Sequence, residues 1–348
     1  MSNKIFEGGV ANNNHRTYLY YTSKPAYYSL IKHDLPLVAD QHISEIYTET
    51  PEFYRRSVVK WLMKHHISWD TLTMGMNPFG DTFNNLAGNV PNTYIIGAPR
   101  AMTTALAINL HKHKDACVAI PKEPKFFSSE YSFGLDYLMY NHYRHYNGEK
   151  AVINASVMDC LLDHSLDRIK ETSGPDAKII FGIRDPIERA VSNWSHLVSR
   201  HPIGTHPASI IDAFERNTKS FDPDKIWYEG DYNANLNAYN STYDNNYLEY
   251  GLYYTMYKKI QSRFDNIFVY TFENLKDRYS ELLDFIGIEQ VGWYDKHINV
   301  NKNHVDGRAD ELRKYLWSRH PDIMSRLVME SEQMTDIIGV DVIRDWNI

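Results

Sequence analysis

The chain of 348 residues contains only two cysteines, Cys117 and Cys160. Two thiols cannot form the disulfide framework of a small secreted domain, and they are too few for the thiolate cage of a structural zinc site. A reducing compartment suits so low a cysteine content. We therefore expect a cytoplasmic protein in which both cysteines are small members of the core.

Long hydrophobic runs and an excess of positive charge are also absent. No apolar stretch approaches the roughly 20 residues that a membrane span requires, and the first 21 residues lack the apolar core of a signal peptide. The 37 lysines and arginines are outnumbered by 44 aspartates and glutamates, which gives a formal net charge of −7. We expect a soluble protein with no membrane span and no nucleic-acid partner, in which any anion-binding site is local.

Several common catalytic signatures are missing. The Walker A loop, G-x-x-x-x-G-K-[ST], does not occur, and neither does the H-E-x-x-H pattern of zinc peptidases or the G-x-S-x-G turn of serine hydrolases. The histidine pairs His65 with His66 and His111 with His113 lack the i, i+4 spacing that places two ligands on one helix face. We therefore predict no metal site.

The sequence does contain enough apolar material for a large folded core. Hydrophobic residues make up 43% of the chain and charged residues 23%, close to the average of globular proteins. The first 90 residues mix aromatic residues with turn signals, and we treat residues 1–90 as an N-terminal extension of unassigned role. Residues 91–348 form the main domain, and within it residues 201–240 carry Pro, Gly, Asn and Asp and are predicted to be a long loop or insertion.

From residue 92 onward, short apolar runs alternate with segments of helical periodicity, which is typical of βα units on a parallel sheet. The predicted strands are 94–97, 117–120, 151–154, 178–183 and 266–271. The predicted helices are 103–113, 163–171, 186–200, 243–264 and 310–336. Together these elements predict an α/β protein with a P-loop-like fold of three layers, in which helices flank a central parallel sheet of about five strands.

The first segment with chemical character is residues 94–106, Y-I-I-G-A-P-R-A-M-T-T-A-L. A buried strand leads into a tight turn and then into a helix that opens with Thr103 and Thr104. This geometry directs backbone N–H groups, the positive helix end, Arg100 and two hydroxyls at one spot, which suits a phosphate or another tetrahedral anion. The alternative is an ordinary turn between a strand and a helix, since the same pattern is common there without any bound anion.

The second segment is residues 178–192, K-I-I-F-G-I-R-D-P-I-E-R-A-V-S. Asp185 is a natural N-cap, and Glu188, three residues later, completes a capping box. Arg184 ends the strand and can converge with Ser192 on a second anion, since arginine matches the geometry of phosphate. The alternative is that Arg184 forms a structural ion pair with Glu188 or Asp185.

Taken together, the two segments resemble the sulfotransferases that use 3′-phosphoadenosine 5′-phosphosulfate (PAPS). In that family a loop of the type Pro-[Lys/Arg]-Ser-Gly-Thr-Thr binds the 5′-phosphosulfate, and a segment Arg-Asp-Pro-x-x-Arg-x-x-Ser binds the 3′-phosphate through its arginine and its serine. Residues 99–104, P-R-A-M-T-T, are similar to the first, and residues 184–192 match the second completely. The resemblance implies binding of the donor by Arg100, Ala101, Met102, Thr103 and Thr104 at the phosphosulfate and by Arg184 and Ser192 at the 3′-phosphate.

The first loop departs from the family pattern at Met102, where the family prefers glycine. The methionine side chain adds bulk where the backbone should approach the anion. An alternative role for Met102 is that of a core residue in register with Leu106 and Leu110.

A third match lies at residues 120–127, I-P-K-E-P-K-F-F, and resembles the Lys-Glu-Pro-x-Phe-Phe stretch of the carbohydrate sulfotransferases related to the heparan enzymes. The resemblance implies that Glu123 is the general base of the transfer. A carboxylate just past a strand end, held between two prolines and followed by two phenylalanines that can exclude water, is suited to that role. The alternative is a surface ion pair between Glu123 and Lys122 or Lys125.

Two further matches are less complete. Asn154 and Ala155 stand where a strand end of the family carries glutamate and lysine, and Lys302 lies in a stretch similar to the loop that closes over the nucleotide. The resemblance covers residues 93–200 well and residues 245–345 faintly. It implies that the main domain is a sulfotransferase-like α/β domain.

The activity that the resemblance implies is transfer of a sulfuryl group from PAPS, as co-substrate and without a metal, to a hydroxyl or amine of an acceptor. A carbohydrate is the acceptor class that it favours, and Arg100 would stabilise the leaving phosphate oxygen. Two other functions stay open: a nucleotide kinase or other phosphotransferase, and a non-catalytic module that binds a glycan or a protein on the same fold. The sequence specifies neither the acceptor nor the oligomeric state.

Overall fold

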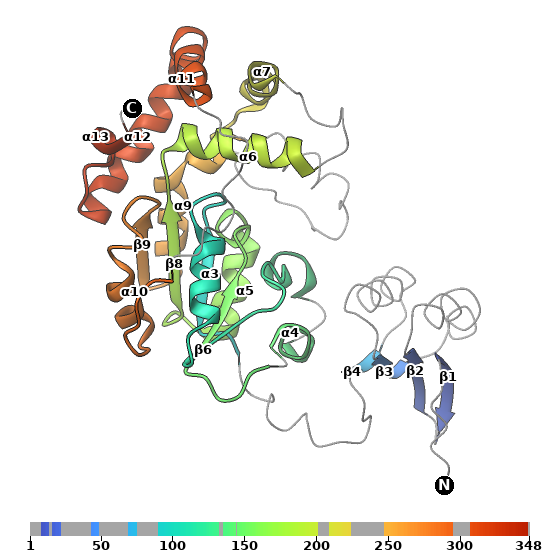
Figure 1. Cartoon of the computed structure of the whole chain (residues 1–348). Helices are drawn as coiled ribbons and strands as arrows, with labels where there is room; N and C mark the ends of the chain where they lie inside the picture. Colours follow the sequence, from blue (N-terminus) through green and yellow to red (C-terminus); the bar gives the residue numbers. More distant parts are fainter. Residues whose placement is uncertain are drawn as a thin grey trace. The chain divides into compact units, whose positions relative to one another are not determined.

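The structure, a computed structural model, describes residues 8–13, 16–21, 43–48, 69–74, 90–131, 135–143, 145–200, 209–223, 247–294 and 307–346 (Figure 1). Its contacts divide the chain into two compact units. One comprises Met1–Asn89 with Leu135–Arg144, and the other comprises Val90–Gly134 with His145–Ile348.

The first unit contains a four-stranded sheet that was not predicted from the sequence. Its strands, in spatial order, are β1 (Gly8–Asn13), β2 (Arg16–Tyr21), β3 (Ile43–Thr48) and β4 (Trp69–Met74). β1 and β2 are antiparallel, whereas β2 with β3 and β3 with β4 are parallel. The helix α4 (Leu135–His142), which was also not predicted, belongs to this unit.

The second unit is built on a parallel sheet of five strands in the order β6-β7-β5-β8-β9. The strands are β5 (Thr93–Gly97), β6 (Ala116–Val118), β7 (Ala151–Ala155), β8 (Lys178–Ile183) and β9 (Ile267–Thr271). Every residue of β5, β6 and β7 is buried, which explains why these strands occur in the sequence as continuous apolar runs. The predicted fold class is confirmed.

The strand order makes β5 a topological switch point. After β5 the chain crosses to the edge strand β6 and returns to β7 on one side of β5, and it then passes to β8 on the other side. Loops that leave the carboxyl ends of such neighbouring strands run in opposite directions, and ligands bind in the crevice between them. The carboxyl ends of β5, β7 and β8 are therefore the expected position of a binding site.

Helices cover both faces of this sheet. On one face, α3 (Thr103–His111) and α10 (Tyr279–Ile286) share a buried core with Ile95 and Ile180 of the strands. On the other face, Tyr94 lies against α5 (Asp163–Ser173), with its hydroxyl 2.5 Å from the hydroxyl of Ser173. Phe181 packs against Tyr253 of α9 (Tyr253–Gln261) on that face, with ring centroids 6.4 Å apart.

A second apolar cluster joins the helices beyond β8. It is formed by α6 (Pro186–Arg200), α7 (Ile210–Ser220), α11 (Arg308–Arg319) and α12 (Pro321–Ile338), which bury Trp194, Phe214, Leu316 and Leu327 among others. The short helix α13 (Val342–Trp346) ends the described chain. Within the described residues, no helix is long and apolar enough to cross a membrane.

The helix predicted over 243–264 is wrong in its extent. Its described part is a 3-10 turn, Glu249–Gly251, followed by α9, and Leu252 between them has a non-helical backbone (φ −83°, ψ 65°). The chain turns here because Gly251 packs onto Pro186, so closely that a Cβ on the glycine would lie 2.8 Å from the proline Cβ.

Two other predictions are corrected by local chain chemistry. The single helix predicted over 310–336 is two helices, because Pro321 lacks an N–H and disfavours a helical backbone at His320 (φ −140°, ψ 58°). The loop predicted over 201–240 contains α7, whose first turn is capped by the hydroxyl of Ser209, 3.3 Å from the N–H of Asp212. Residues 201–208 and 224–240 lie outside the described residues.

A buried polar network joins α6, α7 and the turn before α9. Arg189 of α6 is fully buried and donates to the carbonyl of Tyr247. The carboxylate of Glu249 accepts two hydrogen bonds from the side-chain amide of Asn217, at 3.0 and 2.9 Å. Burial raises the pKa of Glu249 to about 7, although the Asn217 amide and the charge of Arg189 oppose the shift.

Glu249→Gln should therefore change how stability depends on pH. The folded-state pKa of Glu249 exceeds the ordinary value, so folding takes up a proton between about pH 4.5 and 7, and the free energy of unfolding falls as the pH rises through this window. The variant lacks this titration. Its free energy of unfolding, relative to that of the wild type, should therefore rise by roughly 1–3 kcal/mol between pH 4.5 and pH 8. Urea unfolding of both proteins at the two pH values measures the effect, and identical pH slopes would contradict it.

Candidate anion-binding site at the carboxyl edge of the sheet

The two loops that the sequence analysis singles out after β5 and β6 have an unusual backbone. Among the described residues, four non-glycine residues have a positive φ, and all of them lie in these loops: Arg100 (71°), Met102 (59°), Glu123 (66°) and Lys125 (57°). Such conformations cost about 1–3 kcal/mol each and persist where the surroundings impose them, often at functional sites. The loops are therefore held in shape by the rest of the fold.

Tyr270 of β9 helps to hold the loop after β5. Its hydroxyl is fully buried and donates to the carbonyl of Ala101 at 2.7 Å. Tyr270 is the register partner of Gly182 on β8, and a Cβ on that glycine would collide with the tyrosine ring. Gly182 therefore leaves the space through which Tyr270 reaches the loop, and its own carbonyl accepts the N–H of Ala98 at 2.6 Å.

Met102 occupies the N-cap position of α3 and keeps the left-handed backbone that glycine favours. Its side chain is partly buried against the core that Leu106 and Leu110 share, so the position combines loop geometry with packing. Ala101 and Thr103 are buried, and Thr104 is partly exposed. The first turn of α3 contains no acidic residue and no side-chain cap, which suits the approach of an anion.

The fold brings the two predicted anion-binding segments into contact. The Nε of Arg100 donates to the hydroxyl of Ser192 at 3.0 Å, although the two residues are 92 positions apart in the sequence. Arg100 belongs to the loop after β5, and Ser192 lies in the second turn of α6, which follows β8. The loop after β5 and the first turns of α6, which follows β8, therefore lie at the same edge of the sheet.

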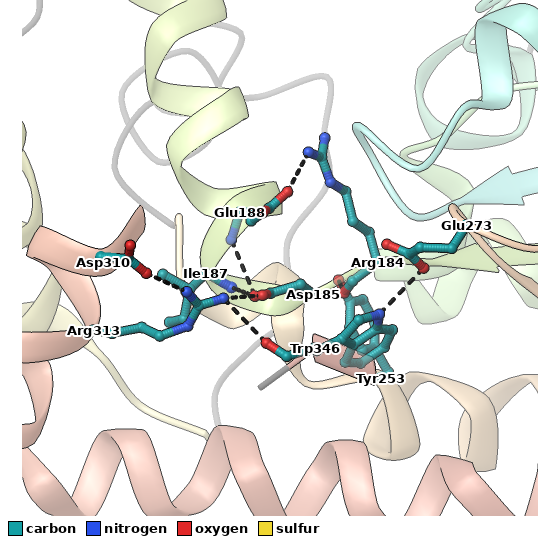
Figure 2. Close-up of polar contacts among 9 residues, drawn as sticks. All are labelled: Arg184, Asp185, Ile187, Glu188, Tyr253, Glu273, Asp310, Arg313 and Trp346. Atoms are coloured by element: carbon teal, nitrogen blue, oxygen red, sulfur yellow. Dashed lines mark hydrogen bonds and ion pairs between the residues drawn. The ribbon is translucent and has the colours of Figure 1, made fainter. Parts of the chain in front are cut away.

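Arg184, at the end of β8, forms the ion pair that the sequence analysis left as an alternative. Its guanidinium lies 2.6 Å from the carboxylate of Glu188, one helical turn away (Figure 2). The same guanidinium lies over the ring of Phe272 at 4.2 Å, and the backbone carbonyl of Arg184 accepts the hydroxyl of Tyr253 at 2.7 Å. Within the described residues, the buried Nε of Arg184 has no hydrogen-bond partner.

Asp185 is the N-cap of α6, as predicted. One carboxylate oxygen accepts the N–H groups of Ile187 and Glu188 at 2.8 and 3.1 Å. The other oxygen pairs with Arg313 of α11 (Figure 2). Burial raises the pKa of Asp185, and the Arg313 charge opposes this effect.

Arg313 links this cap to the end of the chain. It also pairs with Asp310 at 3.0 Å and donates to the carbonyl of Trp346 at 3.4 Å (Figure 2). The matched segment 184–192 thus divides into two groups: Asp185 and Arg189 are buried and hold the helix, whereas Arg184 and Ser192 adjoin the loops of the site.

Glu123 stands at the carboxyl end of β7. Its N–H donates to the carbonyl of Ala155 at 2.9 Å, and its carboxylate accepts the N–H of Val157 at 2.9 Å. The other carboxylate oxygen pairs with Lys122, which is the alternative considered from the sequence. The Glu123 side chain is 30% exposed, so it remains accessible from solvent.

The chain around Glu123 contains several buried residues. Phe126 and Phe127, in the π-helical turn Phe126–Glu130, are fully buried. Asp159, in the 3-10 turn Asp159–Leu161, is fully buried as well, and burial together with the charge of Glu123 raises its pKa well above the usual range. The next residue, Cys160, packs against the end of β5 so closely that a Cβ on Gly97 would collide with its sulfur.

The structure brings most of the predicted site residues to one edge of the sheet. Arg100 and Ser192 touch, and residues 101–104 continue from Arg100 into α3. Arg184 follows β8, and Glu123, from the loop after β6, lies at the end of β7; both β8 and β7 are neighbours of β5. Lys302 lies outside the described residues. In the part of the chain that the structure describes, no group of three or more His, Cys, Asp or Glu side chains is arranged to hold a metal ion.

Three residues with a place in the site were not identified from the sequence: Tyr270, Phe272 and Arg313. A glycine inside a buried strand, Gly182, signals that another group approaches closely, but it does not name the neighbour. Arg313 carries no local signal, because its partner Asp185 is 128 residues away.

No protein-family model matches the chain, and no curated protein matches it. Among solved structures, a sulfotransferase from Alicyclobacillus acidocaldarius resembles it with a TM-score of 0.52 and 21% sequence identity. The match covers 75% of this chain and 100% of that chain. The likeness shows that the chain shares the fold of this sulfotransferase.

Tyr270→Phe should weaken the loop after β5 while leaving the core packing intact. The ring stays in its place over Gly182, but the carbonyl of Ala101 loses its hydrogen bond, which should lower the free energy of unfolding by about 1–2 kcal/mol. Tyr279→Phe is the control, because Tyr279 is also buried and the described residues provide no partner for its hydroxyl. Equal losses in the two variants, measured by urea unfolding, would count against the role of the Tyr270 hydroxyl.

Proposed function

We propose that this protein is a sulfotransferase that uses PAPS as donor and transfers its sulfuryl group to a hydroxyl or amine of an acceptor, with a carbohydrate as the favoured acceptor class. One observation carries the proposal: the hydrogen bond of 3.0 Å from Arg100 to Ser192. It joins the loop that resembles a phosphosulfate site to the segment that resembles a 3′-phosphate site. A donor with anionic groups at both its 5′ and 3′ positions needs these two segments side by side.

The chemistry of the residues present fits such a donor. Arg100 and Arg184 stand at the carboxyl ends of the neighbouring strands β5 and β8, and α3 begins directly after the Arg100 loop without a side-chain cap. The guanidinium of Arg184 is partly exposed, and its buried Nε lacks a partner among the described residues, so its hydrogen-bonding capacity is not used up by the fold. Arginine presents its N–H groups in a planar fork that matches phosphate.

The residues would divide the work of the transfer. The donor supplies an activated sulfuryl group. The N–H groups of residues 101–104 and the hydroxyls of Thr103 and Thr104 would hold the 5′-phosphosulfate, and Arg100 would neutralise charge on the leaving phosphate oxygen. Arg184 and Ser192 would hold the 3′-phosphate and thereby orient the donor for in-line displacement.

Glu123 is the proposed general base. The N–H of Val157 orients its carboxylate, and the partial exposure of the side chain allows an acceptor hydroxyl to approach. Position supports this role, since Glu123 is hydrogen-bonded to Ala155 at the carboxyl end of β7, and β7 neighbours β5, whose loop carries Arg100. A base at this edge would accept the proton of the acceptor hydroxyl as the bond to sulfur forms.

Arg184→Ala tests the 3′-phosphate assignment. It should weaken binding of 3′-phosphoadenosine 5′-phosphate by about 10²-fold, because a charge-assisted hydrogen bond to phosphate is lost, and it should change binding of AMP far less. Isothermal titration calorimetry with both nucleotides measures the two affinities. Equal losses would overturn the assignment, and a wild-type protein that does not bind 3′-phosphoadenosine 5′-phosphate would favour a non-catalytic module.

Glu123→Gln tests the general base. The variant should lower turnover by roughly 10²-fold or more, with binding of 3′-phosphoadenosine 5′-phosphate nearly unchanged. Labelled PAPS assayed against carbohydrate, lipid and phenolic acceptors identifies the acceptor and then measures turnover. Glu289→Gln is a matched control, because Glu289 also pairs with a neighbouring lysine, Lys114, but at an exposed position. Unchanged turnover in the Glu123 variant would show that another residue is the general base.

A further inference from the structure

The carboxylate of Glu188 forms an ion pair with the guanidinium of Arg184. The proposed function assigns the 3′-phosphate to this same guanidinium. Glu188 and Arg184 are 2.6 Å apart, and their side chains are 47% and 18% exposed (Figure 2). A phosphate that binds Arg184 therefore meets a competing anion that belongs to the protein itself.

The fold does not need this carboxylate to start α6. The side chain of Asp185 already accepts the N–H groups of Ile187 and Glu188 and caps the helix. The charge of Asp185 is balanced by Arg313, so Arg184 is not required there either. A half-exposed ion pair at i, i+4 spacing contributes little to stability, and a carboxylate in the first turn of a helix is favourable by itself.

Arg184 is held in place by groups other than Glu188. Its guanidinium lies 4.2 Å from the centre of the Phe272 ring, and its backbone carbonyl accepts the Tyr253 hydroxyl. Its buried Nε has no partner among the described residues. The guanidinium is thus held in place without the help of Glu188, and an anion that pairs with its exposed part must displace this carboxylate.

We propose that Glu188 is an affinity- and specificity-determining residue that competes with the 3′-phosphate for Arg184. The inference rests on the proposed function. A doubly charged 3′-phosphate displaces the carboxylate. A nucleotide such as AMP carries a neutral hydroxyl at the 3′ position and cannot displace it. Once displaced, the carboxylate of Glu188 stays near the bound phosphate, because Glu188 is only four residues after Arg184. Repulsion between the two negative charges then limits how tightly the desulfated product is retained.

Glu188→Gln tests this competition, with the full chain and calorimetric titration of 3′-phosphoadenosine 5′-phosphate and AMP. We expect the variant to bind 3′-phosphoadenosine 5′-phosphate about 3- to 10-fold more tightly than the wild type and AMP within about two-fold of it. Glu188→Ala should change both affinities in the same way. Glu215→Gln is the matched control, since Glu215 is similarly exposed and pairs with Lys219 at i, i+4 on α7, and it should leave both affinities unchanged.

Each other result has a distinct meaning. Affinity for 3′-phosphoadenosine 5′-phosphate that is unchanged or weaker in Glu188→Gln overturns the competition but leaves the proposed function standing. An equal gain for AMP, or the same gain in Glu215→Gln, also overturns it, because the effect would then be one of net charge. Failure of the wild type to bind 3′-phosphoadenosine 5′-phosphate overturns the proposed function and this inference together.

Discussion

Tyr270 reaches from β9 past β8 to the loop after β5, where its hydroxyl donates to the carbonyl of Ala101. Gly182 makes this contact possible, since any side chain at that position would fill the space of the tyrosine ring. Arg100 and Met102, on either side of Ala101, both have a left-handed backbone, which needs support from outside the loop. The direction of Arg100, and with it the contact to Ser192, depends on this support.

The site also separates buried charges from accessible ones. Asp185 and Arg189 are nearly or fully removed from solvent, and each has a partner that offsets the cost of burial: Arg313 for the carboxylate and the carbonyl of Tyr247 for the guanidinium. Arg184 and Glu123 are partly exposed and bind neighbouring charged side chains that water or a ligand can replace. The buried group keeps the helix start rigid, so the accessible group can exchange partners without disturbing the fold.

Features with a local cause were largely predictable. The buried strands, the start of α6 at Pro186 and the cap at Asp185 follow from apolar runs and cap chemistry. The errors have physical reasons as well. The break at His320 could have been predicted from Pro321. The helix α7 was missed because its capping serine and its apolar residues lie in a stretch rich in turn residues. The turn at Gly251 depends on its contact with Pro186, 65 residues earlier in the chain, which no local pattern expresses.

The amino-acid sequence by itself determined where the strands of the main sheet run, where α6 begins and which residue types follow the strand ends, because caps and periodicity act over a few neighbouring residues. Only the tertiary structure decided that Arg100 meets Ser192, that Arg313 balances Asp185 and that Arg184 rests on Phe272 beside Glu188. These contacts follow from the order β6-β7-β5-β8-β9, which sets the loops of distant segments side by side. That order is chosen by the packing of the whole core, and no short segment of the sequence contains it.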